Sequence, residues 1–158
     1  MKPPRPPPHE ISTAPHPKMP GGEWWGRARQ DKILKAAQIV KDDGIAIPIL
    51  LGDNKVIKQI IEDNGLDLSD VEIINTRSRS TDARREAYGD FFFEKRKRRG
   101  YNIYEARKMM RDRNYFGCMM VQTGEADALI SGLTRKYPDT IRPALQIIGT
   151  AEQNRKVA

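Results

Sequence analysis

The feature that most constrains the fold is an alternation, between residues 31 and 75, of amphipathic segments with short apolar runs. Residues 31–44 and 53–65 carry apolar side chains at helical spacing and end at glycine, which predicts two helices. Residues 45–51 and 71–75 are short apolar runs, typical of parallel strands buried on both faces. The order helix, strand, helix, strand predicts an α/β, three-layer fold, with a mostly parallel sheet and flanking helices.

Capping patterns mark where helices should begin. Asp53 or Asn54 is placed to cap the second of these helices. Asn102 and Glu105 have the spacing of a capping box, which predicts the start of another helix. Residues 114–124 are apolar nearly all round, which predicts a buried helix that ends at a glycine.

Two further elements are predicted from apolar spacing. Residues 80–100 predict one long helix, with Ala83, Ala87 and Phe91 four residues apart and with Tyr88 and Phe92 beside them. Residues 126–130 form a short apolar run, which predicts one more strand of the sheet.

Proline dominates the N-terminal segment, since eight of the eleven prolines of this 158-residue chain lie in its first twenty residues. Residues 1–30 are therefore predicted to be disordered, and the folded domain to occupy residues 31–158. The segment has no apolar stretch of the kind a signal peptide needs. No apolar run in the chain approaches the ~18 residues of a membrane span, so the sequence favours a cytoplasmic protein without membrane contact.

Composition excludes several kinds of chemistry. The only histidines, His9 and His16, fall in the proline-rich segment, so the predicted domain has no imidazole for a catalytic triad or a metal site. The only cysteine, Cys118, can form neither an intrachain disulfide nor a cysteine-built zinc site, and its apolar neighbours predict a buried, inert thiol. The net charge of +7 favours an anionic partner without identifying it.

The stretch SGLTRKYPDTIRPALQIIG, residues 131–149, predicts a Ser-Gly turn followed by a helix whose cap is Asp139 or Thr140. Arg142 would lie in the first turn of that helix, where free backbone N–H groups attract anions. From the residues alone, two interpretations stay open. One is an anion site, and the other is a turn followed by a surface ion pair.

Five consecutive cations, at residues 95–99, crowd the end of a predicted helix. Cations at such a position complement the helix dipole and are usually solvated. A nucleic-acid interface is the alternative, although the neighbouring phenylalanines have core spacing and do not alternate with the charges. Glu125 and Asp127 precede the Ser-Gly turn, where capping is a more usual role for a carboxylate than acid-base catalysis.

Two stretches resemble one known family. GEADALISGLTRKYPDTIRPALQIIG and ILKAAQIVKDDGIAIPILLGD are similar to the phosphate acetyltransferase and butyryltransferase family, and the resemblance covers residues 31–158. Within that family, the first stretch most resembles the domain at the carboxyl end of hybrid NADP-dependent malic enzymes. The resemblance implies an isocitrate/isopropylmalate dehydrogenase-like phosphotransacetylase fold with two subdomains. A deep cleft in that fold brings acyl phosphate and coenzyme A together.

The resemblance also implies site residues. Arg96 and Arg142 match the two phosphate-binding arginines of this half of the family domain. Ser131, Gly132 and Thr134 match the loop that lines the same cleft. The implied ligands are acetyl-CoA, acetyl phosphate or phosphate, and no metal site is implied.

Departures from the family pattern accompany this match. The place of the family's first strand is taken by GGEWWGRARQ, which has no strand pattern, and the chain stops about where the family's first half finishes. The sequence is therefore interpreted as a fragment, the N-terminal half of the family domain. Arg135, Lys136 and Tyr137 stand where stand-alone acetyltransferases tend to have a His-Ser type of sequence.

Three functional hypotheses follow. The first is a regulatory domain of a hybrid malic enzyme that binds acetyl-CoA and contributes to homo-oligomers, with NADP and a divalent metal bound only by an attached malic-enzyme portion. The second is a fragment of a phosphate acetyltransferase. The third is a basic nucleic-acid-binding protein. No cofactor is expected in this chain itself, and the resemblance leaves open whether the chain catalyses acyl transfer.

Overall fold

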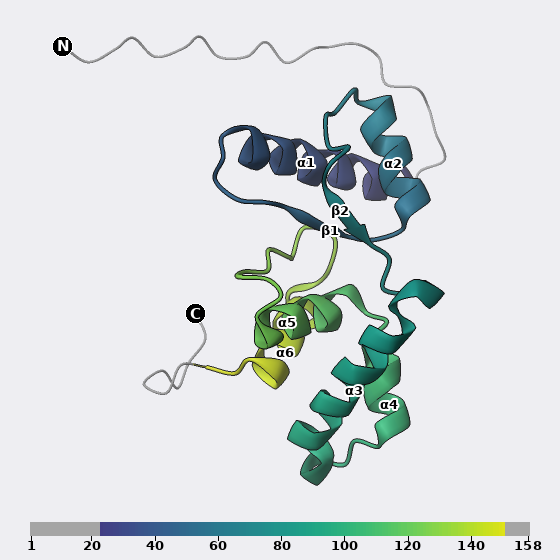
Figure 1. The fold of residues 1–158 in the computed structure, drawn as a ribbon, viewed down its shortest axis with the longest axis vertical. Coiled ribbons are helices and arrows are strands. Elements are labelled where there is room, and N and C mark those ends of the chain that lie inside the picture. Colours follow the sequence, from purple (N-terminus) through teal and green to yellow (C-terminus); the bar gives the residue numbers. More distant parts are fainter. Residues whose placement is uncertain (1–22, 151–158) are drawn as a thin grey trace, which may run out of the picture.

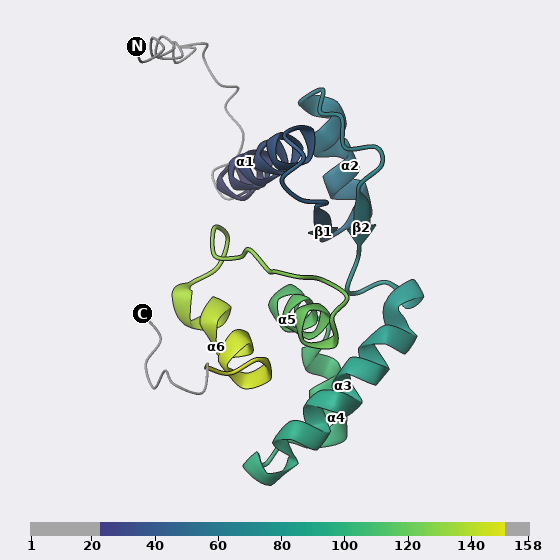
Figure 2. The ribbon, with the colours of Figure 1, turned by 60° about the vertical axis from the view of Figure 1, so that its left-hand side comes forward.

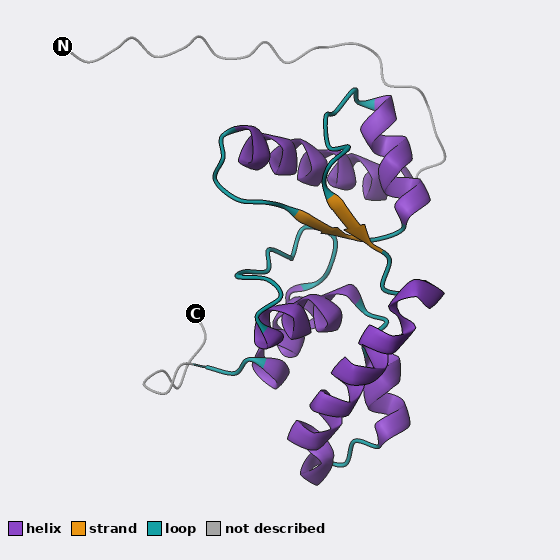
Figure 3. Ribbon diagram, viewed as in Figure 1, coloured by secondary structure: helices purple, strands orange, loops and turns teal. Residues whose placement is uncertain are grey.

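The computed structural model describes the backbone of residues 23–150 and the side chains of residues 30–150. Its main helices and strands are α1 (Glu23–Asp42), β1 (Ile49–Leu51), α2 (Asn54–Asp63), β2 (Glu72–Ile74), α3 (Asp82–Arg96), α4 (Ile103–Met109), α5 (Arg113–Thr123) and α6 (Tyr137–Ile147). Short 3-10 turns, η1 (Arg79–Thr81) and η2 (Lys97–Arg99), precede and follow α3. The described part is thus an α/β unit in which helices predominate (Figure 3).

The helix α1 begins earlier than predicted. Residues 23–30, predicted to be disordered, are helical, and the prediction for residues 1–22 lies outside the described residues. The reason is that the prolines end at Pro20 and the next one is Pro48, so nothing in the intervening sequence blocks the helical hydrogen bonds.

Two parallel strands separate two hydrophobic clusters. β1 pairs with β2 in the register Leu50 to Ile73 and Leu51 to Ile74. Side chains alternate across a strand, so Leu50 packs into the cluster under α1 and α2, while Leu51 packs against the larger cluster on the other side. Helices accordingly lie on both faces of the small sheet, with α1 and α2 on one side and α5 on the other (Figures 1 and 2).

The predicted caps of α2 and α4 are confirmed. The Asp53 carboxylate accepts hydrogen bonds from the backbone N–H groups of Lys55 and Val56, at 2.9 and 3.2 Å. Asn102 and Glu105 form the predicted capping box at the start of α4. The helix α5 is buried and ends at a glycine, as its apolar composition predicted.

The predicted apolar stripe of the long helix is confirmed only in part. Ala83, Ala87 and Phe91 are exposed in α3, whereas Tyr88 and Phe92 are buried. The cause is the helix α4, which packs along the adjacent face of α3, as Figure 1 shows. Tertiary contact with α4 therefore buried the side of the predicted stripe that carries Tyr88 and Phe92.

The predicted strand at residues 126–130 is also absent from the described structure. This segment is irregular, and Ile130 is 96% exposed. It nevertheless lies beside β1, because Leu129 and Leu51 both come within 3.0 Å of the Cβ position at Gly117 in α5. Leu129 packs into the larger cluster, so the segment is placed by its side chain and not by a strand ladder.

Candidate functional site

The loop that begins at Ser131 is held against the start of α5. The Ser131 hydroxyl donates a hydrogen bond to the Asn114 side-chain oxygen, at 2.7 Å. The Arg135 guanidinium pairs with the Asp112 carboxylate at 2.8 Å, and this carboxylate also caps α5. The loop is therefore fixed at two points, four residues apart.

The carboxyl end of β1 meets the same place. The residue after β1 is Gly52, and the Arg113 guanidinium of α5 lies 3.9 Å from its Cβ position. The Ser131 loop, the end of β1 and the start of α5 therefore converge. Ligands of open α/β proteins collect at the carboxyl ends of parallel strands, which makes this edge the candidate functional site.

Gly132 and Thr134 shape the loop itself. Gly132 has φ of 129°, a conformation that residues with a Cβ rarely adopt, while no atom lies within 4 Å of its Cβ position. Glycine is therefore required by the turn and not by a neighbouring group. Thr134 is exposed in the turn that follows, and its hydroxyl makes no hydrogen bond within the described part of the chain.

The helix α6 begins earlier than predicted, which moves Arg142. Its cap is Lys136, which makes no side-chain capping bond, and neither Asp139 nor Thr140 is the cap. Pro138 lies in the first turn, where a residue without an N–H is tolerated, so the helix starts before it. Arg142 consequently lies in the second turn and not at the free N–H groups of the helix start. The predicted anion site at a helix terminus is therefore not formed in this way.

Arg96 lies at the opposite end of α6. Its guanidinium donates to the backbone oxygen of Gln146 at 2.7 and 2.9 Å and to that of Leu145 at 3.2 Å. The Lys95 ammonium donates to the backbone oxygen of Ile147. Helix ends leave such carbonyl groups without helical partners. Two of the five clustered cations therefore cap α6, in place of being solvated at the end of their own helix.

Arg142 is exposed and has no hydrogen bond or ion pair with the described residues. It lies one turn before Gln146, whose side chain connects two tyrosines. The Tyr115 hydroxyl donates to the Gln146 side-chain oxygen at 2.7 Å, and the Gln146 nitrogen donates to the Tyr101 hydroxyl at 3.1 Å. Burial raises the pKa of Tyr115 to about 12, and the charges of Tyr101 and of Arg142 act on it in opposite directions. The Tyr115 hydroxyl therefore stays protonated at neutral pH.

The predicted site residues are thus distributed along α6 and do not surround one point. The Ser131 loop lies at its first turn, Arg142 in its second turn and Arg96 at its end. At a rise of 1.5 Å per residue, the seven steps from Asp139 to Gln146 span about 10 Å. Such a row suits an extended ligand better than a single small anion.

Sequence reasoning missed Asn114 and Gln146. Asn114 is 6% exposed and joins the Ser131 loop to α6, since its side-chain nitrogen donates to the backbone oxygen of Asp139 at 3.2 Å. One signal could have found it. Pro143 lies inside α6 and cannot donate to the carbonyl four residues earlier, so a donor for Asp139 had to come from elsewhere.

Glu125 makes structural contacts. It accepts a hydrogen bond from the Tyr88 hydroxyl at 2.6 Å and pairs with Arg84 at 2.9 Å. Burial, followed by this hydrogen bond, raises the pKa of Tyr88 to about 12. Asp127, the other carboxylate near the loop, is exposed.

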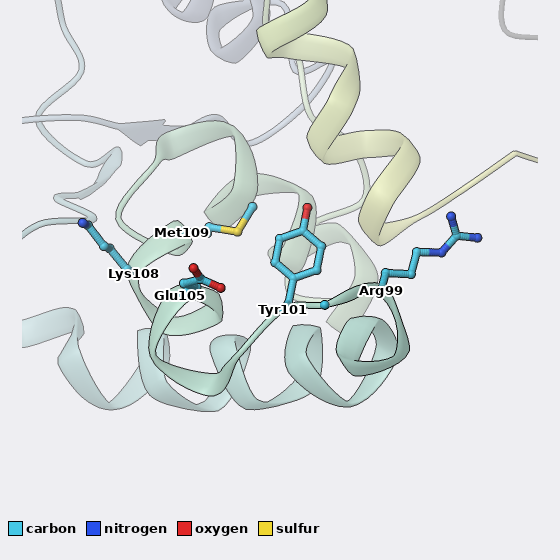
Figure 4. Close-up of a pocket in the computed structure, with 6 residues that line it drawn as sticks. Arg99, Tyr101, Glu105, Lys108 and Met109 are labelled. Atoms are coloured by element: carbon cyan, nitrogen blue, oxygen red, sulfur yellow. The ribbon is translucent and has the colours of Figure 1, made fainter.

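A shallow hollow of about 440 Å³ lies between residues 99–101 and α4, and no residue of the Ser131 loop lines it. Its lining includes Tyr101, Glu105 and Met109. In Figure 4 the side chains of Arg99 and Lys108, which also line it, extend away from one another on opposite sides. The hollow therefore has no set of converging charges to bind an anion.

Within residues 30–150, no group of three or more histidine, cysteine or acidic side chains is arranged to hold a metal ion. None of the described helices is both long enough and apolar enough to cross a membrane.

The chain is an α/β protein in which a loop, beginning at Ser131, lies at the carboxyl end of the parallel strands. This places it in the class of α/β proteins that bind ligands at that edge of the sheet. The particular family follows from comparison with known proteins. Residues 26–158 match the family described as "Phosphate acetyl/butaryl transferase". The chain belongs to this family.

Relatives and solved structures agree with the family match. The chain is 42% identical over 123 residues to phosphate acetyltransferase of Thermoanaerobacterium thermosaccharolyticum, covering 77% of this chain and 36% of that protein. It is 42% identical over 121 residues to that of Synechocystis sp., covering 75% and 17%. The structure of EutD phosphotransacetylase from Staphylococcus aureus is similar, with a TM-score of 0.70, 33% identity and coverage of 82% and 38%. A phosphotransacetylase from Streptococcus pyogenes has a TM-score of 0.63, 33% identity and coverage of 74% and 34%.

The chain therefore spans well under half the length of these relatives. Their names support the hypothesis of a phosphate acetyltransferase. They give no support to a regulatory domain of a malic enzyme, which was the first hypothesis from the sequence.

Proposed function

We propose that the chain supplies one side of a site that transfers an acyl group between phosphate and coenzyme A. The observation that carries this proposal is the row formed by the Ser131 loop, Arg142 and Arg96 along α6, in a chain whose relatives are named phosphate acetyltransferases. Acetyl phosphate and coenzyme A together form an extended ligand, which suits a row about 10 Å long.

In the proposed reaction, the sulfur of coenzyme A attacks the acyl carbon, and the bond from that carbon to the phosphate oxygen breaks. The thioester forms, phosphate leaves with the electron pair, and the thiol proton is released. No residue of this chain needs to carry the acyl group. The Cys118 thiol, for example, is 1% exposed, and burial raises its pKa to about 11.

Arg142 is the proposed phosphate ligand, because its guanidinium is exposed and has no partner among the described residues. Arginine binds phosphate oxygens through two parallel hydrogen bonds, which stabilise the charge that develops on the leaving phosphate. Arg96 differs, because Nε and Nη2 bond to α6 carbonyls and only Nη1 makes no hydrogen bond within residues 30–150. Arg96 is therefore proposed to hold α6 and to reach phosphate through Nη1.

The test is calorimetric titration of the chain with acetyl phosphate and, separately, with coenzyme A. Arg142→Ala should weaken acetyl phosphate binding by about 10-fold or more, as expected for hydrogen bonds to a charged group. Lys58→Ala is the charge-matched control, because Lys58 is an exposed cation within α2, and it should change affinity less than about twofold. Equal losses in the two variants, or no binding of either ligand by the unmodified chain, would overturn the proposal.

Acyl transfer distinguishes the proposal from the regulatory hypothesis. Formation of acetyl-CoA from acetyl phosphate and coenzyme A should be measured in the polypeptide that contains this chain, before and after the Arg142→Ala substitution. Turnover that falls with the substitution supports transfer. Acetyl-CoA binding with no turnover would favour a regulatory role instead.

A further inference from the structure

The backbone carbonyl group of Asp139 has no hydrogen-bond donor within α6, because Pro143 stands where that donor would be. Proline has no N–H, so in α6 it cannot bond to the backbone oxygen of Asp139, four residues earlier. The side-chain nitrogen of Asn114 donates to this oxygen instead, at 3.2 Å. A carbonyl oxygen only accepts, so the Asn114 amide has a defined orientation, with its nitrogen toward Asp139 and its oxygen on the other side.

This orientation determines what the Ser131 hydroxyl can do. The Asn114 oxygen faces Ser131 at 2.7 Å, and since an amide oxygen only accepts, Ser131 must donate its single proton to it. Reversing the amide would place two oxygens together at Asp139 and leave Asn114, 6% exposed, with an unsatisfied buried group. The hydroxyl therefore presents only its lone pairs to a ligand.

The surrounding loop keeps this arrangement in place. Ser131 is itself exposed, so its lone pairs are accessible. The loop is held a second time by the ion pair between Arg135 and Asp112, and Gly132 provides the turn between the two anchors.

We propose that Asn114 is a positioning residue that makes Ser131 a hydrogen-bond acceptor, so that Ser131 recognises an N–H donor and not a phosphate oxygen. The donor class is a secondary amide, which the pantetheine arm of coenzyme A supplies. This inference rests on the proposed function, because it assigns the Ser131 end of the row to coenzyme A. The phosphate oxygens of acetyl phosphate are acceptors and are left to the arginines.

The experiment compares two probes, pantetheine and inorganic phosphate, by titration of the 158-residue chain. Ser131→Ala should weaken pantetheine binding by about three- to tenfold, the range for one neutral hydrogen bond, and should change phosphate binding less than about twofold. Equal weakening for both probes, or an effect on phosphate alone, would overturn the inference while leaving the proposed function in place. A chain that binds neither probe would overturn both.

Two substitutions at Asn114 separate positioning from stability. Asn114→Asp keeps an acceptor for the Ser131 proton but loses the donor to Asp139, so it should lower the melting temperature and leave pantetheine affinity within about twofold. Asn114→Leu removes both groups and leaves the hydroxyl free to donate as well as to accept, so it should lose part of the pantetheine affinity, less than Ser131→Ala loses. If Asn114→Asp loses as much affinity as the Ser131→Ala chain, Asn114 acts only through stability and the positioning role is wrong.

Discussion

Gly89→Ala tests the packing of α3 against α4, which decided the buried side of α3. Gly89 is buried in the middle of α3, facing α4. A Cβ at this position would lie 2.6 Å from the Arg107 Cα and 2.9 Å from the Arg107 backbone nitrogen. Because these are backbone atoms, no change of rotamer can relieve the contact, and the two helices would have to move apart.

The expected magnitude is the difference of two effects. Alanine is favoured over glycine in a helix interior by about 1 kcal/mol. Overpacking of a close contact costs about 1–3 kcal/mol, and a contact with backbone falls at the upper end of that range. Gly89→Ala should therefore lower the free energy of unfolding by about 2 kcal/mol, although the substitution is favourable for an isolated helix.

The matched control is Gly117→Ala in α5. A Cβ there would lie 2.8 Å from Leu129 Cδ1 and 3.0 Å from Leu51 Cδ1, which are the ends of flexible side chains. The helix preference should then nearly offset the crowding, and stability should change by less than about 1 kcal/mol. Urea unfolding followed by circular dichroism measures both variants. A Gly89→Ala chain at least as stable as the original would refute the close approach of α3 and α4.

Three further predictions follow from the same contacts. Arg96→Ala should lower the free energy of unfolding by about 1 kcal/mol, because α6 loses its capping donors. Arg142→Ala should change that free energy by less than about 0.5 kcal/mol. Similar midpoints of urea denaturation for the two variants would contradict this difference. The pKa of Tyr88 is raised from 10.0 to about 12, so the protonated phenol stabilises the fold below pH 10, and this contribution is lost as pH rises toward 12. Tyr88→Phe should therefore reduce the fall in the free energy of unfolding over this pH range. An unchanged dependence on pH would show that Tyr88 does not cause the fall. Cys118, whose pKa burial raises to about 11, should react with a thiol reagent at neutral pH at least about 100-fold more slowly in the folded chain than in urea, and comparable rates would show that α5 is not buried as described.

Much of the local structure could be predicted from neighbouring residues alone. Asp53 caps α2 because its carboxylate reaches N–H groups two and three residues ahead, and the capping box of α4 is equally local. The alternation of helices with short apolar runs likewise predicted helices on both faces of a parallel sheet.

The site was predicted less completely. Ser131 and Gly132 were correctly placed in a loop that precedes a helix, but the helix start was predicted too late, and Arg142 was therefore assigned to the wrong turn. The contacts of Arg96 with the end of α6 span fifty residues of sequence and follow no local spacing.

What the sequence by itself determined is therefore the set of interactions that close within one or two helical turns. These are the caps of α2 and α4, the glycine turns, and the missing N–H donor at Pro143. The sequence also indicated the family. Only the tertiary structure decided which face of α3 is buried. It also decided which side chain donates to the Asp139 carbonyl in place of the missing N–H group. The reason is that both depend on which element packs alongside: α4 approaches at Gly89, and α5 brings Asn114 to α6.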